Sequence, residues 1–151
     1  MSIIDLIFPI HLIAATSWIG GSVFMFILGV TIRSKEDQKK VYPIVGPIFG
    51  WFELGALIVL LSTGVILGIQ FHLFPMIFQN MNIPVSDAVT KKVLIVTILT
   101  IVTVVHFVIA YRSNDRERSH MEQILSRSSS MLILVLNLFV MYYAILLRNI
   151  L

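Results

Sequence analysis

Four long stretches of this 151-residue chain contain no Asp, Glu, Lys or Arg. They cover residues 6–32, 54–86, 93–111 and 128–147. An α-helix needs about 20 mainly apolar residues to cross the roughly 30 Å hydrocarbon core of a bilayer. Within lipid, a helix also satisfies its own backbone hydrogen bonds. The pattern therefore predicts an all-α integral membrane protein with four spans, whose first partner is the lipid bilayer.

The composition excludes several classes of protein. The chain is 58% hydrophobic and 13% charged, with a mean hydropathy of +0.95, whereas ordinary soluble domains are about 45–50% apolar and about 25% charged. A soluble enzyme, a disordered regulator and a nucleic-acid-binding module are therefore excluded. The chain has no cysteine, which excludes disulfides, thiolate metal sites and covalent c-type haem attachment. Any metal or cofactor must be held by His, Met, carboxylates, Lys or the backbone.

The four stretches predict a single transmembrane domain over residues 1–151. Helices are expected at about 8–32, 48–73, 87–111 and 129–148. Pro9 and Pro47 suit the first turns of the first two helices, and Ser128 or Ser129 suits the N-cap of the fourth. The first stretch lacks a basic leader and is too long for a signal peptide, so it is interpreted as a retained span. Short connections favour an up-down four-helix bundle.

Basic residues are distributed unevenly between the two ends of the predicted bundle. Lys91, Lys92 and Arg148 lie at one end, and the other eight lie in or beside the first and third loops. These eight are Arg33, Lys35, Lys39, Lys40, Arg112, Arg116, Arg118 and Arg127. Cytoplasmic loops are enriched in Lys and Arg. Both termini are therefore expected outside (N-out/C-out), which in a bacterial inner membrane places them in the periplasm.

Ionisable side chains inside membrane spans are rare and are candidates for function. His11 and His72 lie near the outer ends of the first two spans, at similar expected depth. At 1.5 Å per residue, His11 lies roughly 5 Å inside the outer boundary. His106 lies roughly 21 Å inward of Lys92 on the same basis, and is expected to lie apart from the other two. His120 falls in a charged loop, where solvation explains it.

His11 and His72 are suited to clamp one planar cofactor between the first two helices. Two neutral imidazoles make a low-spin b-type haem site, whereas a structural zinc site needs about four ligands. Gly64, Gly68 and His72 recur at every fourth residue, which fits either close helix packing or room for a flat ring. Trp18, two turns from His11, fits the edge of a cofactor or equally a place in the core or at the interface.

Two further positions extend this interpretation. Lys91 or Lys92, on the same side of the membrane as the two outer histidines, is suited to pair with a haem propionate. The alternative for either lysine is an interfacial position from which the ammonium reaches water. His106 is either a ligand of a second cofactor or a hydrogen-bonded core histidine.

Two polar residues of the spans have structural explanations. Glu53 lies on the inner side of the second span and is expected to pair with Arg33 or Arg112, which would relieve a costly buried charge. The second interpretation of Glu53 is a group through which protons enter. Asn137 in the fourth span is expected to join two helices through a hydrogen bond.

The run His11-Leu-Ile-Ala-Ala-Thr-Ser-Trp-Ile-Gly-Gly resembles the first helix of the CopD superfamily, which is usually tied to copper resistance or uptake, and of HemJ-type protoporphyrinogen oxidases. Thr63-Gly64, Lys91 or Lys92 at the start of the third span, and His106 toward its end match the same pattern. The resemblance implies haem binding, with His11 and the third-helix lysine as essential residues. The segment after the glycines lacks the Pro-Arg-Leu-Phe and the second histidine of the HemJ group. A CopD-like haem protein is therefore the better match.

Taken together, these features predict a b-type cytochrome of a bacterial inner membrane. His11 and His72 are expected to hold haem b near the periplasmic face. One haem is expected, or two if His106 is a ligand. Electron transfer with a quinone or a periplasmic redox partner is the expected activity.

Two alternatives remain open. In a HemJ-like oxidoreductase, Lys91 or Lys92 would hold a propionate or move a proton. A CopD-like copper transport or binding protein would use the two outer histidines together with Met76 and Met81, since thioether and imidazole suit Cu(I). The glycine-rich face of the second span also fits a homodimer.

Overall fold

The computed structural model describes residues 3–78, 84–112 and 120–150. This part of the chain is helical apart from short connections, and it contains no strand. Four of its helices are long and apolar enough to cross a membrane, so the predicted all-α membrane bundle is confirmed. The helices are α1 (Ile3–Thr31), α2 (Lys35–Gln70), α3 (Leu73–Phe78), α4 (Pro84–Arg112) and α5 (His120–Ile150).

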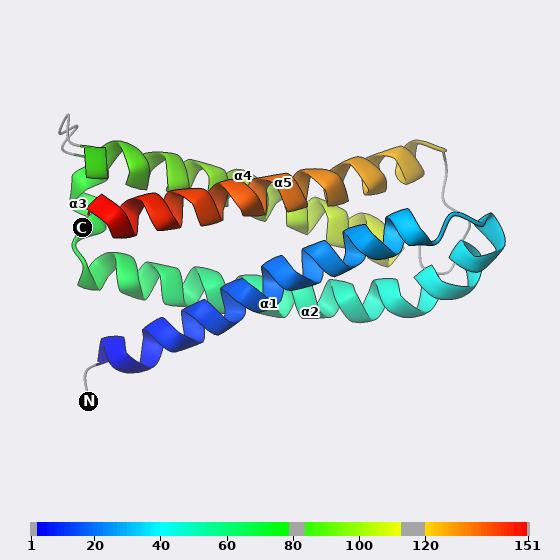
Figure 1. Cartoon of the computed structure of the whole chain (residues 1–151), viewed down its shortest axis with the longest axis horizontal. Coiled ribbons are helices and arrows are strands. Elements are labelled where there is room, and N and C mark those ends of the chain that lie inside the picture. The colour runs from blue at the N-terminus through cyan, green and yellow to red at the C-terminus, as the bar shows by residue number, and fades with distance from the viewer. Residues whose placement is uncertain (1–2, 79–83, 113–119, 151) are drawn as a thin grey trace.

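The four long helices run up and down and pack mainly as two pairs, α1 with α2 and α4 with α5 (Figure 1). Contacts of α1 with α5 and of α2 with α4 join the pairs. The short α3 connects α2 to α4 where α1 begins and α5 ends, and we call this end of the bundle the α3 end. The opposite end is the basic end, because the described part of the chain carries Arg33, Lys35, Lys39, Lys40 and Arg112 there.

α2 is longer than its apolar stretch. A loop over 33–46 is predicted from the sequence, but the chain is helical from Lys35 onward. Ser34 stands in an extended conformation at the N-cap, and two acidic residues follow in the first turn, where they interact favourably with the helix dipole. Pro43 and Pro47 both lie inside the helix, so the prediction that Pro47 opens it is wrong. The connection from α1 is therefore only three residues long.

α4 and α5 also begin earlier than predicted. Pro84 is the first residue of α4, a position where its missing N–H leaves no backbone bond unmade. α5 begins at His120, so the predicted cap at Ser128 or Ser129 is wrong and both serines lie within the helix. The predicted bound of α5 missed residues 120–127 because they lie outside the uncharged stretches, whereas the predicted start of α4 at residue 87 missed only residues 84–86.

The centre of the bundle is a layer to which each long helix contributes one buried residue. The layer consists of Trp18, Leu57, Leu99 and Ile133. A smaller cluster at the α3 end consists of Ala88, Val89 and Leu147, and α3 packs against it. The packing of these two clusters sets the register between the helices, and this register determines which polar residues of the spans come into contact.

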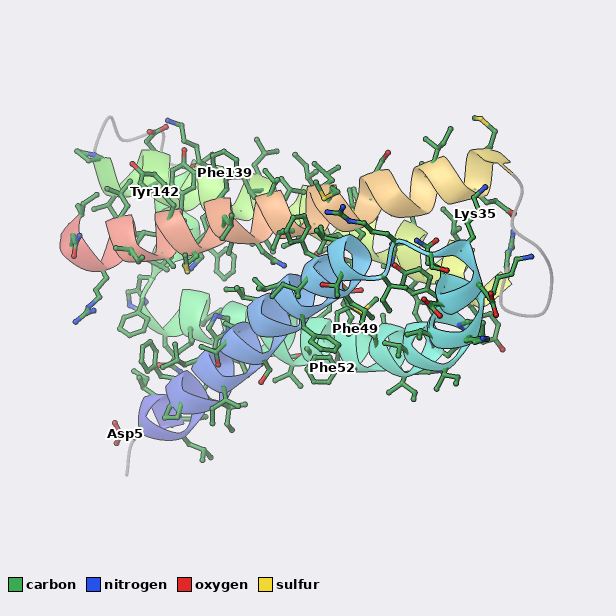
Figure 2. The ribbon with its side chains drawn as sticks, turned by 45° about the vertical axis from the view of Figure 1, so that its right-hand side comes forward. Asp5, Lys35, Phe49, Phe52, Phe139 and Tyr142 are labelled. Atoms are coloured by element: carbon green, nitrogen blue, oxygen red, sulfur yellow. The ribbon has the colours of Figure 1, made fainter. Side chains whose placement is uncertain are left out.

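Large apolar side chains also cover the outside of the bundle. Phe139 and Tyr142 of α5 point away from the other helices (Figure 2) and are 51% and 58% exposed. Phe49 and Phe52 of α2 instead lie beside α1 (Figure 2), where a Cβ added at Gly21 would come within 2.8 Å and 3.2 Å of their rings. Exposed apolar surface on this scale marks contact with an apolar phase, which for these helices is the bilayer.

Candidate functional site

His11 is held against α2 in a defined orientation. It is half-buried, and its Nδ1 lies 2.7 Å from the Thr63 hydroxyl oxygen. That hydroxyl donates its single hydrogen to the Val59 carbonyl at 2.6 Å, so it accepts from His11 and Nδ1 is the donor. The Nε2 atom of His11 is then the lone-pair nitrogen, which is the form of imidazole that binds a metal or accepts a proton.

His72 presents the same tautomer at the same end of the bundle. It lies on the turn between α2 and α3, is exposed, and has a φ of 54°. Its Nδ1 lies 3.1 Å from the Ile69 carbonyl, which can only accept, so Nε2 again carries the lone pair. The left-handed backbone after a helix normally favours Gly or Asn, and a histidine there is held against its local preference.

Side chains of other residues lie close to Gly64 and Gly68, the two glycines that precede His72 on α2. A Cβ added at Gly64 would lie 3.5 Å from His11 Cε1, and one added at Gly68 would lie 2.8 Å from the Phe74 ring. Close packing against Phe74 therefore accounts for Gly68, where the predicted free room for a flat ring is occupied, whereas a Cβ at Gly64 would make only an ordinary van der Waals contact with His11. His72 follows Gly64 by eight residues, which is roughly 12 Å along the direction of α2.

The structure separates the two adjacent lysines of α4. Lys91 is exposed and forms an ion pair with Asp87 at 2.7 Å. Lys92 is half-buried, and its ammonium lies within electrostatic range of the His11 imidazole. Lys92 is thus the lysine that belongs with His11, and Lys91 matches the interfacial alternative.

Trp18 and Glu53 form a pair in the centre of the bundle. Trp18 is 4% exposed and belongs to the central layer, which matches the core alternative rather than a cofactor edge. Its Nε1 donates to Glu53 Oε1 at 3.2 Å. Among the described residues, the expected ion pair of Glu53 with Arg33 or Arg112 is absent, because both arginines lie exposed at the helix ends.

His106 lies apart from His11 and engages α5. Its Nδ1 lies 2.7 Å from the Ser129 hydroxyl oxygen, which fits the hydrogen-bonded core histidine. Within the described residues, no group of three or more His, Cys, Asp or Glu side chains gathers as a metal site. The copper alternative involves Met81, which lies outside the described residues, and Met76, whose side chain is not described. His120 is the first residue of α5, and its side chain likewise lies outside what the structure describes.

Two residues of this arrangement, Thr63 and Ser22, were not predicted from the sequence. Thr63 was noted only as half of a Thr-Gly pair, although it is the side chain that orients His11. Ser22 accepts a 3.0 Å hydrogen bond from Asn137, so the expected interhelical role of Asn137 is confirmed and its partner is identified. Neither partner has a signal in the sequence, because each depends on the register between two helices.

Comparisons with protein-family models, with curated proteins and with solved structures find no match to this chain. The function is therefore inferred from the residues and from the arrangement described above.

Proposed function

We propose that this chain is a haem b-binding protein of a bacterial inner membrane, and that it transfers electrons. His11 and His72 would be the axial ligands, close to the periplasmic face. The observation that carries the proposal is that both imidazoles lie at the α3 end and both keep Nε2 as the lone-pair nitrogen, because Nδ1 donates elsewhere. Haem iron binds imidazole in this form.

Two imidazoles are suitable ligands for haem iron, and the neighbouring residues are suited to orient a ligand and to stabilise a propionate. The hydrogen bond from His11 to Thr63 fixes the tautomer and ring orientation, as outer-shell partners do for metal-binding histidines. Lys92 places a positive charge within electrostatic range of His11, and such a charge would stabilise a propionate carboxylate. Phe74 lies over Gly68, one turn before His72, and its ring would have to turn aside. A bound haem supplies one-electron redox chemistry, and a quinone or a periplasmic redox protein would be its partner.

The wild-type protein provides the direct test. We expect the purified chain, expressed with ample haem, to give the reduced-minus-oxidised spectrum of a low-spin b-type haem. A pyridine haemochrome assay should return about one haem per chain, as one axial histidine pair requires. A colourless protein would contradict the proposal and would make copper binding the leading alternative.

A second candidate function is a HemJ-like protoporphyrinogen oxidase. The observation that favours it is that Lys92 lies within electrostatic range of His11, since the resemblance names a first-helix histidine and a third-helix lysine. In this reading Lys92 would hold a carboxylate of the porphyrinogen or carry a proton. Rescue of a bacterial mutant that lacks this oxidation step would favour the enzyme over the electron-transfer protein.

The two adjacent lysines form a matched pair of variants. Lys92→Ala is expected to lower haem affinity about tenfold, or ~1.4 kcal/mol, because a charged partner of a propionate is lost. Lys91→Ala removes an exposed ion pair with Asp87 and is expected to leave haem affinity unchanged. Haem titration of both variants measures the difference. Equal loss in both variants would contradict the assignment of Lys92.

The proposed topology can be tested because the chain has no cysteine, so each introduced thiol is the single one. Lys35 and Asn149 are exposed at opposite ends of the bundle. With the basic end in the cytoplasm, a membrane-impermeant maleimide added to intact spheroplasts should label Asn149→Cys and spare Lys35→Cys. Labelling of Lys35→Cys alone would show the reverse orientation.

A further inference from the structure

The carboxyl group of Glu53 lies in the middle of the bundle and has no part in the proposed haem site. Glu53 is 18 residues from the start of α2 and 17 from its end, which places it roughly 27 Å and 26 Å from the two ends. Its side chain is 2% exposed. A carboxylate at this position would need a cation or several donors, because an isolated charge in an apolar medium is costly.

The surroundings of Glu53 supply one donor and no positive charge. Within the described residues, its hydrogen-bond partner is the Trp18 indole N–H, and no cation interacts with it. The next turn of α2 toward the α3 end carries Leu57 of the central layer, and the turn before it carries Gly50, packed on Phe107. A single neutral donor does not replace the solvation of an ionised carboxylate.

A second, independent observation lies on α4. Thr103 is 1% exposed, and its hydroxyl is the one buried side-chain polar atom of the described residues without a hydrogen-bond partner. The hydroxyls of Thr97 and Thr100 on the same helix donate back to the carbonyls four residues earlier, but that of Thr103 does not. This hydroxyl can therefore accept a hydrogen bond from an acid O–H.

The packing register places Thr103 at the level of Glu53. Leu99, one turn before Thr103, shares the central layer with Leu57. Phe107, one turn after it, contacts the Gly50 position. Since α2 and α4 are antiparallel, the turn of α4 that carries Thr103 lies opposite the turn of α2 that carries Glu53.

We propose that Glu53 is a proton-binding site buried in the membrane. The carboxylate takes up one proton, an O–H bond forms on the carboxyl, and the charge is removed from the apolar layer. The Trp18 N–H continues to donate to Oε1, because an indole nitrogen can only donate. The Thr103 hydroxyl is the acceptor available to the new O–H.

The other groups around this position are neutral or already engaged. From α1, Ser22 donates to the Trp18 carbonyl and accepts from Asn137 of α5. The titratable group next along α4 is His106, which lies against Ser129 of α5. The proton site is thus separate from the His11 end of the bundle, and it goes beyond the proposed haem function.

The test uses dicyclohexylcarbodiimide, a hydrophobic reagent that modifies protonated carboxyl groups within membranes. The full-length protein in liposomes is treated over a range of pH, and adducts are located by peptide mass spectrometry. We expect an adduct at Glu53 that declines as the pH rises and is lost in Glu53→Gln. Glu36→Gln, which alters an exposed acid paired with Lys40, is the control and should keep the Glu53 adduct.

Infrared spectroscopy gives a second readout that does not depend on reagent access. A carboxylic-acid C=O band should be present in the wild type and in Glu36→Gln, lost in Glu53→Gln, and shifted in Thr103→Val. Glutamine retains an oxygen acceptor for Trp18, so the variant should fold, and circular dichroism checks this. Absence of both adduct and band at every pH would overturn the proposal. The outcome is independent of whether haem is bound, so the two proposals fail separately.

Discussion

Replacing His11 with alanine is expected to abolish haem binding. The variant loses a half-buried imidazole that a hydrogen bond to Thr63 orients near the α3 end of the bundle. Haem per chain, measured by pyridine haemochrome after purification with haem in excess, should fall from about one to near zero. His72→Ala should lose the low-spin spectrum as well, because the second axial ligand is removed.

Two further variants make the His11 prediction specific. Thr63→Val keeps the imidazole but removes its acceptor, and haem affinity should fall roughly 10- to 100-fold, as for other outer-shell changes. His106→Ala, which alters a histidine bonded to Ser129, should retain haem. Loss of haem in His106→Ala alone, or two haems per wild-type chain, would show that the proposed ligand pair is wrong.

Replacing Trp18 with alanine is expected to produce the largest loss of stability in the bundle. Trp18 fills the central layer with residues from the three other long helices, and truncation of a buried aromatic side chain typically costs about 3–5 kcal/mol. The change also removes the N–H that Glu53 accepts, which adds a buried unpaired acceptor. Unfolding in detergent micelles, followed by circular dichroism, measures the free energy of unfolding.

The chain contains its own control for this prediction. Trp51, its second tryptophan, is 60% exposed, and Trp51→Ala should lower the free energy of unfolding by much less. Trp18→Phe keeps most of the volume and removes the N–H, so it separates the hydrogen bond from packing. Equal losses in Trp18→Ala and Trp51→Ala would contradict the central layer as the main source of stability.

The sequence predicted the fold class and the number of spans because apolar length alone decides which segments enter a bilayer. It predicted the helix ends poorly for a related reason. Residues 35–46 and 120–127 are helical but carry charges, so they lack the apolar signal that defined the spans. Pro43 and Pro47 favoured a boundary on local grounds, yet α2 continues through both.

For the candidate site, the sequence identified the residue types but not their pairing. His11 and a lysine of α4 were both predicted, and only the rotation of α4 determines that Lys92 is half-buried within electrostatic range of His11 while Lys91 meets Asp87. Successive residues on a helix point about 100° apart, so the two adjacent lysines differ in burial and in their neighbours. The partner of Glu53 was mispredicted because charge matching favoured an arginine, whereas the register of α1 against α2 presents Trp18.

α2 is the longest helix that the structure describes, and its charged first turns bend away from the line of its apolar part (Figure 1). Its 36 residues span roughly 54 Å, about 24 Å more than the hydrocarbon core of a bilayer. The first turns of α2 carry charges at the basic end, while Glu53 beside Trp18 and Thr63 beside His11 lie further along the same helix. Because Glu53 and Thr63 lie ten residues apart on one continuous helix, a displacement of this part of α2 would alter the contacts of Trp18 and of His11 together.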